Sequence, residues 1–149
     1  KIKKEIKISN EFNDARILIQ KKETNKAKEK FYKIIDDQNS FYSPLSLYLV
    51  IENNMESDEK IISSLFDKVI NIGDIDNETK NLVKIKKTLF LMKANKNEQE
   101  ILNELKPIIN SESIWRQNAI EIIGGYFLSK GDKIKSEEFY NLLDKSKNK

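Results

Sequence analysis

Pairs of a small and a large residue, four positions apart, recur along the chain and constrain its fold more than any other feature. Near the C-terminus, Ser136 precedes Tyr140 at this spacing, and Gly124 lies twelve residues before Ser136. Residues four apart share one helix face, so the small residue lets a second helix approach while the ring fills the space beside it. Gly131-Asp132 supplies a turn between the two helices. Residues 114–143 therefore predict an antiparallel helical hairpin.

This arrangement resembles the tetratricopeptide pattern, in which W-x₂-L-G-x₂-Y on one helix precedes A-x₃-F on the next. Four copies can be placed at steps of 35, 39 and 35 residues, close to the repeat period of about 34 residues. The small positions of the second helices are Ala27, Ile62, Ile101 and Ser136, followed by Phe31, Phe66, Leu105 and Tyr140. The outer copies match well and the middle two only weakly, because Ile62 and Ile101 are bulky, so the array is degenerate. The positions for close packing on the first helices, twelve residues earlier, are Ala15, Val50, Leu89 and Gly124.

The spacing predicts an all-α fold, because no stretch alternates apolar and polar residues over the length of a strand. We expect a TPR-like superhelix of about four antiparallel hairpins, with about eight helices, forming a single repeat domain over residues 1–149. The four expected hairpins span roughly residues 3–38, 41–72, 77–109 and 111–146.

Capping residues suggest where several helices begin or end. Pro107 is expected to bend or end the sixth helix, because it lacks an N–H donor and clashes with the preceding turn. The expected N-terminal signals are Thr24 for the second helix, Ser43-Pro44 for the third, Ser57 for the fourth, Asn97 for the sixth, and Ser111 or Ser113 for the seventh.

The composition argues against an enzyme. The chain has neither cysteine nor histidine, which removes thiol chemistry and the commonest general base and metal ligand. Glu100 and Glu104 share a helix face, but solvated carboxylates explain them better than a di-iron site does, because no Glu-x-x-His motif is present. Gly124-Gly125 follow no strand, so they indicate close helix packing and not a phosphate loop. We therefore expect no catalytic, cofactor or metal site.

The repeat register predicts a surface for binding a partner protein. In stacked helical hairpins the first helices line the concave side, which is where these scaffolds bind extended or helical peptide segments. Trp115 and Arg116 have two readings: a binding hot spot, or a structural wedge in which Arg116 pairs with a nearby carboxylate. The structural reading is favoured. The predicted partner-binding residues are Phe12, Arg16, Leu47, Ile51, Lys86, Phe90, Asn118 and Glu121.

The C-terminal third also resembles a particular family. The residues that carry the resemblance are Ser113-Ile114-Trp115-Arg116, then Ala119, Ile123 and Gly124, then Lys130-Gly131-Asp132, and finally Phe139, Tyr140 and Leu143. They look like the C-terminal part of YfgM-type tetratricopeptide proteins, especially the alphaproteobacterial members. The resemblance implies an N-terminal membrane anchor upstream of Lys1, a repeat domain in the periplasm, and a role beside the SecYEG translocon and periplasmic chaperones. Translocon subunits, chaperones or client chains are then the expected partners, with no small-molecule substrate.

Three other functions stay open from the sequence. The first is a soluble cytosolic adaptor that uses the same groove to bind a peptide segment. The second is an enzyme that uses carboxylates, which would need clustered buried acids. The third is a nucleic-acid-binding protein, which would need a one-sided basic face. A net charge of +3, with lysines interleaved among acidic residues, favours a mixed solvated surface over such a face.

Overall fold

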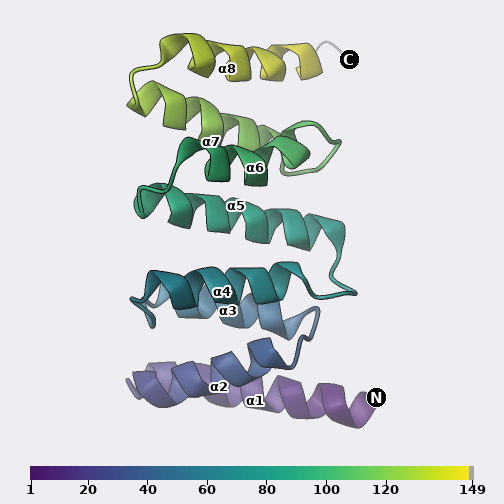
Figure 1. Cartoon of the computed structure of the whole chain (residues 1–149). Helices are drawn as coiled ribbons and strands as arrows, with labels where there is room; N and C mark the ends of the chain where they lie inside the picture. Colours follow the sequence, from purple (N-terminus) through teal and green to yellow (C-terminus); the bar gives the residue numbers. More distant parts are fainter. Residues whose placement is uncertain (148–149) are drawn as a thin grey trace. The chain divides into compact units, whose positions relative to one another are not determined.

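The computed structural model describes residues 1–147, which form eight α-helices and no strand (Figure 1). The all-α prediction is therefore confirmed. The chain falls into two compact units, Lys1–Val83 and the part from Lys84 onward, where a single repeat domain was expected. The superhelical winding of the hairpins stays a prediction. The helices are α1 (Ile2–Gln20), α2 (Thr24–Asp36), α3 (Tyr42–Glu52), α4 (Glu59–Ile70), α5 (Asn77–Lys93), α6 (Glu98–Ile109), α7 (Arg116–Ser129) and α8 (Lys133–Lys147).

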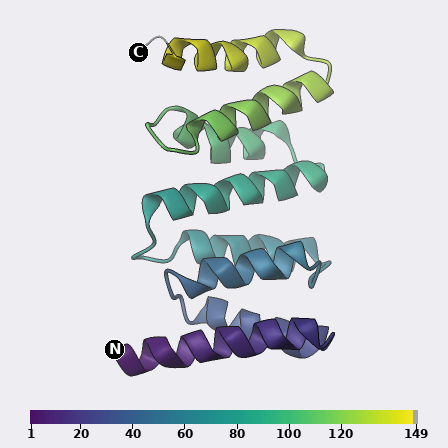
Figure 2. The same ribbon diagram turned by 180° about the vertical axis from the view of Figure 1, so that it is seen from behind.

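The first unit is built from the α1–α2 and α3–α4 hairpins. Each helix packs on the next one in the chain, and α1 also contacts α3 while α2 contacts α4, as expected for one hairpin stacked on another. Figure 2 shows the α1–α2 pair from the side of α1. Phe31 and Phe66, the predicted large positions of the two second helices, are fully buried in this unit. The ring of Phe31 meets that of Phe12 edge-on, with centroids 5.9 Å apart.

The second unit has its own apolar core. Its α7 packs closely against both α6 and α8, while α5 adds Ile85 and Leu91 to the core cluster. Phe127 of α7 is 2% exposed and stacks on Phe139 of α8, with ring centroids 5.6 Å apart and planes 6° from parallel. The fully buried Ile101 and Leu105 of α6 confirm that the predicted small and large positions face this core, although neither side chain is small.

The first helix of every hairpin ends in the same backbone motif. One residue adopts a left-handed conformation, its N–H donates to a carbonyl three residues back, and the next N–H donates five residues back. This pair of bonds is the Schellman motif, which satisfies the unpaired carbonyls at a helix C-terminus. Only Gly131 was recognisable as such a position from the sequence. The left-handed residues are Lys22 after α1, Asn54 after α3, Asn95 after α5 and Gly131 after α7, with φ between 51° and 82°.

These motifs correct the register assumed for the two middle hairpins. In the outer hairpins, the close-packing residue lies seven positions before the left-handed residue. The same offset selects Leu47 in α3 and Thr88 in α5, and both are fully buried. The predicted Val50 of α3 is fully buried too, but it lies only four positions before Asn54. The predicted Leu89 is 49% exposed and was wrong by one position. Counting back from the second helix failed because the turns before α4 and α6 are longer than those before α2 and α8.

Several expected helix starts are displaced by a residue or more. Thr24 is the first residue of α2 and not its cap, and α4 is capped by Asp58 instead of Ser57. The side chain of Asp58 accepts hydrogen bonds from two N–H groups of the first turn. The sixth helix begins near Asn97 as predicted, and the Asn97 side chain caps it by accepting a bond from the N–H of Glu100. Asp, Asn and Ser are about equally good caps, so residue type alone did not distinguish Asp58 from Ser57.

The α7–α8 hairpin packs helix against helix at Gly124. The Ser136 hydroxyl, nearly fully buried, donates to the Gly124 carbonyl oxygen at 2.8 Å. The Tyr140 ring lies over Gly124 so closely that a Cβ built there would meet ring carbons at 2.6–2.9 Å. At Gly125 the nearest atom is the Tyr140 hydroxyl oxygen, at an ordinary 3.7 Å. Gly124 is therefore required by the close approach of the Tyr140 ring, whereas Gly125 is not.

Gly124→Ala and Gly125→Ala should consequently change stability in opposite directions. We expect Gly124→Ala to lower the free energy of unfolding by about 1–2 kcal/mol, because displacing the ring outweighs the gain in helix propensity. Gly125→Ala should raise it by about 0.5–1 kcal/mol, because alanine restricts the unfolded chain without a clash. Urea denaturation of both variants measures the difference. Equal effects of the two substitutions would contradict the packing at Gly124.

Candidate functional site

The predicted partner-binding residues of the first unit differ in their exposure. Leu47 is fully buried and Phe12 is 7% exposed, so both belong to the core and Leu47 offers no surface to a partner. Ile51 is half-buried. Arg16 is exposed, and its guanidinium carbon lies 6.0 Å from the centroid of the Phe12 ring. Arg16 is therefore the member of this group that is best placed to contact another molecule.

In the second unit, the predicted residues lie on α5 and α7. Lys86 and Phe90 of α5 are half-buried, and Phe90 packs against the core cluster of that unit. Asn118 and Glu121 of α7 are exposed, and Glu121 accepts a hydrogen bond from the Gln117 side chain at 3.2 Å. With the corrected register, the position equivalent to Arg16 on α5 is the exposed Leu89, six residues before Asn95.

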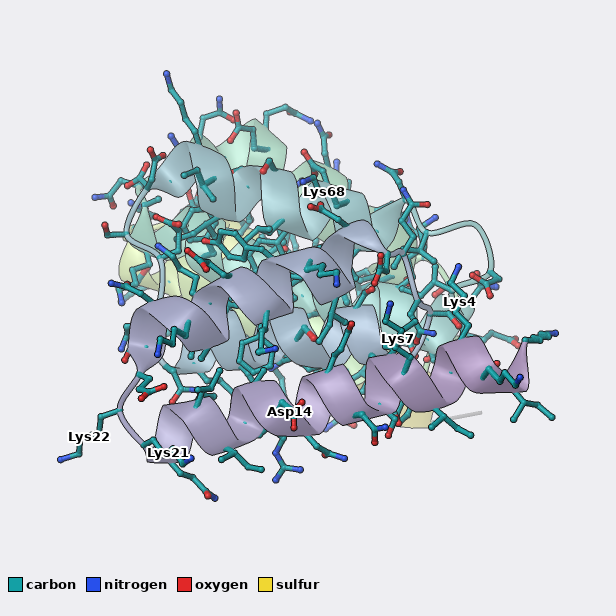
Figure 3. All side chains as sticks on the ribbon, turned by 90° about the horizontal axis from the view of Figure 1, so that it is seen from below. Lys4, Lys7, Asp14, Lys21, Lys22 and Lys68 are labelled. Carbon is teal, nitrogen blue, oxygen red and sulfur yellow. The ribbon has the colours of Figure 1, made fainter. Side chains whose placement is uncertain are left out.

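Positive charge is concentrated at α1, although no motif in the sequence marks it. Residues 1–22 contain seven basic and three acidic residues, giving a net charge of +4, whereas residues 23–149 sum to −1. The excess of the whole chain thus lies on one helix and the turn after it. Figure 3 places Lys4 and Lys7 toward one end of α1 and Lys21 and Lys22 at the other, with Asp14 between them. At 100° per residue, Lys3, Lys7 and Lys21 fall within an arc of about 40° and are exposed, and we call the side of α1 that carries them the basic face.

A pocket with both apolar and polar lining residues adjoins the start of the basic face. It has a volume of about 490 Å³ and is lined by one side of the first turns of α1 and by the segment that joins α2 to α3. Three of its apolar side chains are exposed to solvent, namely Ile2 at 73%, Ile6 at 56% and Phe41 at 62%. Large apolar groups that gather at the surface mark sites of interaction.

The turn that carries Phe41 is fixed by hydrogen bonds. The Asn39 side-chain oxygen accepts bonds from the N–H groups of Phe41 and Tyr42, at 3.0 and 2.7 Å. The buried Ser43 hydroxyl accepts a bond from the Asn39 N–H and donates one to the Ile34 carbonyl. In a Schellman motif the Asn39 N–H would donate to the Ile34 carbonyl directly, so here the hydroxyl bridges the two groups. Ser43 was expected to cap α3, but it serves the end of α2 instead. The turn therefore presents Phe41 to solvent from a defined backbone.

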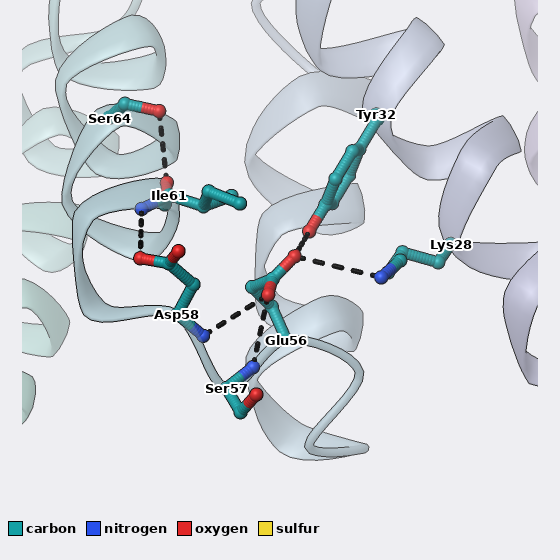
Figure 4. A network of polar contacts seen from close by, with 7 residues as sticks. All are labelled: Lys28, Tyr32, Glu56, Ser57, Asp58, Ile61 and Ser64. Atoms are coloured by element: carbon teal, nitrogen blue, oxygen red, sulfur yellow. Dashed lines mark hydrogen bonds and ion pairs between the residues drawn. The ribbon is translucent and has the colours of Figure 1, made fainter.

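A polar cluster joins the two hairpins of the first unit (Figure 4). Glu56, in the turn between α3 and α4, has a side chain that is only 9% exposed. It accepts a hydrogen bond from the Tyr32 hydroxyl of α2, and the Lys28 ammonium lies 3.7 Å from the same carboxylate oxygen. Its other oxygen accepts from the N–H groups of Ser57 and Asp58, at 3.2 and 3.1 Å. All these donors favour the ionised carboxylate.

The cluster shifts two ionisations in opposite directions. The hydrogen bond from Tyr32, with those from the backbone and the charge of Lys28, lowers the pKa of Glu56 below its usual value, although burial opposes this. Burial, then the bond to Glu56 and its negative charge, raises the pKa of Tyr32. At neutral pH, Glu56 is thus an ionised carboxylate and Tyr32 a neutral hydrogen-bond donor. The cluster therefore links α2 to the turn between α3 and α4 through hydrogen bonds and one ion pair.

Trp115 and Arg116 fit the structural reading in a modified form. Trp115 is the residue before α7 and packs, half-buried, against the core of the second unit. The Arg116 side chain donates from Nε to the carbonyl oxygen of Ile109 at 2.9 Å, where a carboxylate partner was expected. Ile109 is the last residue of α6, which runs two residues past Pro107. A cation there meets an unpaired carbonyl and the negative end of the helix dipole.

Glu100 and Glu104, the acidic residues weighed for catalysis, both lie on α6. Glu104 is not simply solvated, because it pairs with Lys87 of α5 at 2.7 Å and both side chains are less than 20% exposed. Among residues 1–147, no three potential ligands of the His, Cys, Asp or Glu type lie close enough to hold a metal ion. None of the described helices is both long and apolar enough to cross a bilayer.

Comparison with known proteins finds no matching family model, curated protein or solved structure. The resemblance to YfgM-type proteins therefore rests on the sequence motifs alone. What the structure adds is local: a basic face on α1, an exposed apolar rim beside it, and first helices that share one register.

Proposed function

We propose that this chain is a non-catalytic scaffold that binds a segment of another protein along the first helices of its hairpins. The observation that supports this is their common register. Each first helix ends in a Schellman motif and buries the residue seven positions before the left-handed one. Each first helix therefore has its buried residue and its exposed neighbours at the same places relative to its own C-terminal turn, and repeated positions of this kind are how helical repeat proteins build a binding surface.

The exposed members of this surface suggest the chemistry of the segment. Arg16, six residues before Lys22, offers a guanidinium, and Leu89 at the same place on α5 offers an apolar side chain. Asn118 and Glu121 add hydrogen-bonding groups on α7. A carboxylate of a bound segment would suit Arg16 in the first unit, and an apolar side chain would suit Leu89 in the second.

A narrower proposal follows only from the YfgM-type resemblance. In it, a segment outside this chain holds the domain at the bacterial inner membrane, and the domain faces the periplasm and assists the Sec translocon or its chaperones. A soluble cytosolic adaptor is the alternative, with the same mode of binding. The sequence upstream of Lys1 discriminates between them, because only the first requires a long apolar segment there.

Site-specific photo-crosslinking in the source cells tests the proposed function. A photoreactive residue at position 16 or 89 should trap a polypeptide, whereas the exposed control positions 30 and 106, on second helices, should not. Arg16→Glu should then weaken binding of the trapped and purified polypeptide by about tenfold, with an unchanged melting temperature. If the control positions trap the same polypeptide equally well, the assignment to the first helices is wrong.

A further inference from the structure

The exposed side of α1 carries an apolar stripe in addition to its charge. Ile2, Ile6 and Ile17 are exposed at 73%, 56% and 46%, although isoleucine is usually buried. At 100° per residue they fall within an arc of about 60° and extend along about 22 Å of the helix, with the polar Asn13 on the same arc between Ile6 and Ile17. Phe41 extends the stripe at its N-terminal end, where it lines the same pocket as Ile2 and Ile6.

Lysines border this stripe without partners that would neutralise them. Lys3 and Lys7 follow it around the helix on one side, and neither forms an ion pair with any residue described by the structure. Lys21 and Lys22 lie beyond its other end (Figure 3). Glu11, in contrast, faces α2, where it pairs with Lys33 at 3.3 Å. The stripe is thus bordered by lysines that are not neutralised by an ion pair within residues 1–147, and residues 1–22 keep a net charge of +4 although Glu5 lines the pocket and Asp14 lies between the lysines.

We propose that the basic face of α1, together with Phe41, docks on an anionic lipid membrane. Isoleucine and phenylalanine side chains would enter the boundary between headgroups and acyl chains, while the lysines contact the negative headgroups. Lysine suits this position because its apolar stem can lie along the stripe while its ammonium stays in water. The helix lies on the surface and does not cross it. This goes beyond the proposed binding of a polypeptide, which uses other residues.

The geometry favours a membrane over two other occupants. A second copy of the chain would bring two segments of residues 1–22, each with a net charge of +4, against one another, and like charges oppose such contact. An acidic polypeptide would need a groove for its apolar side chains, but the pocket reaches only the first turns of α1, as far as Ser9. A planar surface can meet a convex helix along its whole length and supplies both anionic and apolar groups.

Co-flotation of the whole chain with lipid vesicles tests the proposal. The vesicles contain phosphatidylcholine alone, or phosphatidylcholine with about 30 mol % phosphatidylglycerol. Two test variants remove the charge (Lys3→Glu with Lys7→Glu) or the stripe (Ile2→Ser with Ile6→Ser and Phe41→Ser). Matched controls alter exposed residues elsewhere, namely Lys60→Glu with Lys106→Glu, and Leu128→Ser with Ile134→Ser. Circular dichroism establishes that every variant is folded.

We expect binding to the anionic vesicles only, and less of it at high salt. Each lysine near such a surface contributes about fivefold in affinity, so the charge variant should bind at least about 20-fold more weakly. The stripe variant should also lose binding, and both controls should bind like the unaltered chain. Absence of binding overturns the proposal, as does an equal loss in the lysine control or full binding by the stripe variant. If the chain binds polyglutamate but not vesicles, the face belongs to an acidic protein partner instead.

Discussion

Phe31→Ala should lower the free energy of unfolding by about 3–5 kcal/mol, the largest of the expected losses of stability. The Phe31 ring has no exposed surface and packs edge-on against Phe12 in the first unit. Its removal would leave a cavity between α1 and α2, whose backbones cannot close the space fully. Urea denaturation followed by circular dichroism measures the change.

Phe41→Ala provides the matched control for that experiment. Phe41 is 62% exposed and touches mainly the ring of Tyr42, with centroids 4.9 Å apart. The same substitution should therefore cost less than about 1 kcal/mol. A loss at Phe41 comparable to that at Phe31 would mean that the turn before α3 is buried, and would also weaken the proposed membrane contact.

Glu56→Gln should lower the free energy of unfolding by about 2 kcal/mol at neutral pH. Glutamine keeps the size of the side chain but replaces a carboxylate that accepts three hydrogen bonds and faces Lys28. Hydrogen bonds to charged groups contribute about 1.5–3 kcal/mol, and a buried oxygen that loses its donors is costly. Tyr32→Phe removes the other partner, and the double variant should lose less than the sum of the two single losses.

The effect of Glu56→Gln should also depend on pH. Because folding lowers the pKa of Glu56, the unfolded chain takes up this proton first as the pH falls. The stabilisation is therefore complete above the ordinary value of 4.5 and disappears as the pH falls through the lower value of the folded chain. Denaturation at a series of pH values should show the two proteins converging in acid. A constant difference down to the lowest pH would contradict the assignment.

The outer hairpins could be predicted in detail because their packing residues are explicit in the sequence. Ala15 and Ala27 are fully buried, Gly124 is buried, and Ser136 is only 2% exposed. Small residues at these places leave little choice of register. The middle hairpins use Leu47 and Thr88 instead, which no size pattern distinguishes from other apolar or polar helix residues.

The geometry of the turns was also not predictable from the sequence. A left-handed residue is expected to be glycine, yet Lys22, Asn54 and Asn95 adopt this conformation. Asparagine tolerates it, but lysine carries no local signal for it. Because these left-handed residues were not recognised, the lengths of the turns before α4 and α6 were unknown. The close-packing residues of α3 and α5 were therefore assigned to the wrong positions.

The candidate site was harder to predict than the fold, for a physical reason. Arg16 was correctly expected at the surface, whereas the partnership of Tyr32 with Glu56 joins residues 24 positions apart and leaves no pattern in either helix. The basic face was missed because the net charge of the whole chain is small. Summing the charge of the predicted first helix separately would have found it.

Each hairpin is closed by main-chain atoms, and this has a consequence for how such a protein can diverge. The backbone N–H and carbonyl groups are present whatever the side chain. A substitution in one of these turns can therefore leave the hydrogen bonds of the Schellman motif in place. Lysine, asparagine and glycine already occupy the equivalent bend position within one molecule. The helical hairpins can therefore keep the same fold after their sequences have diverged from one another.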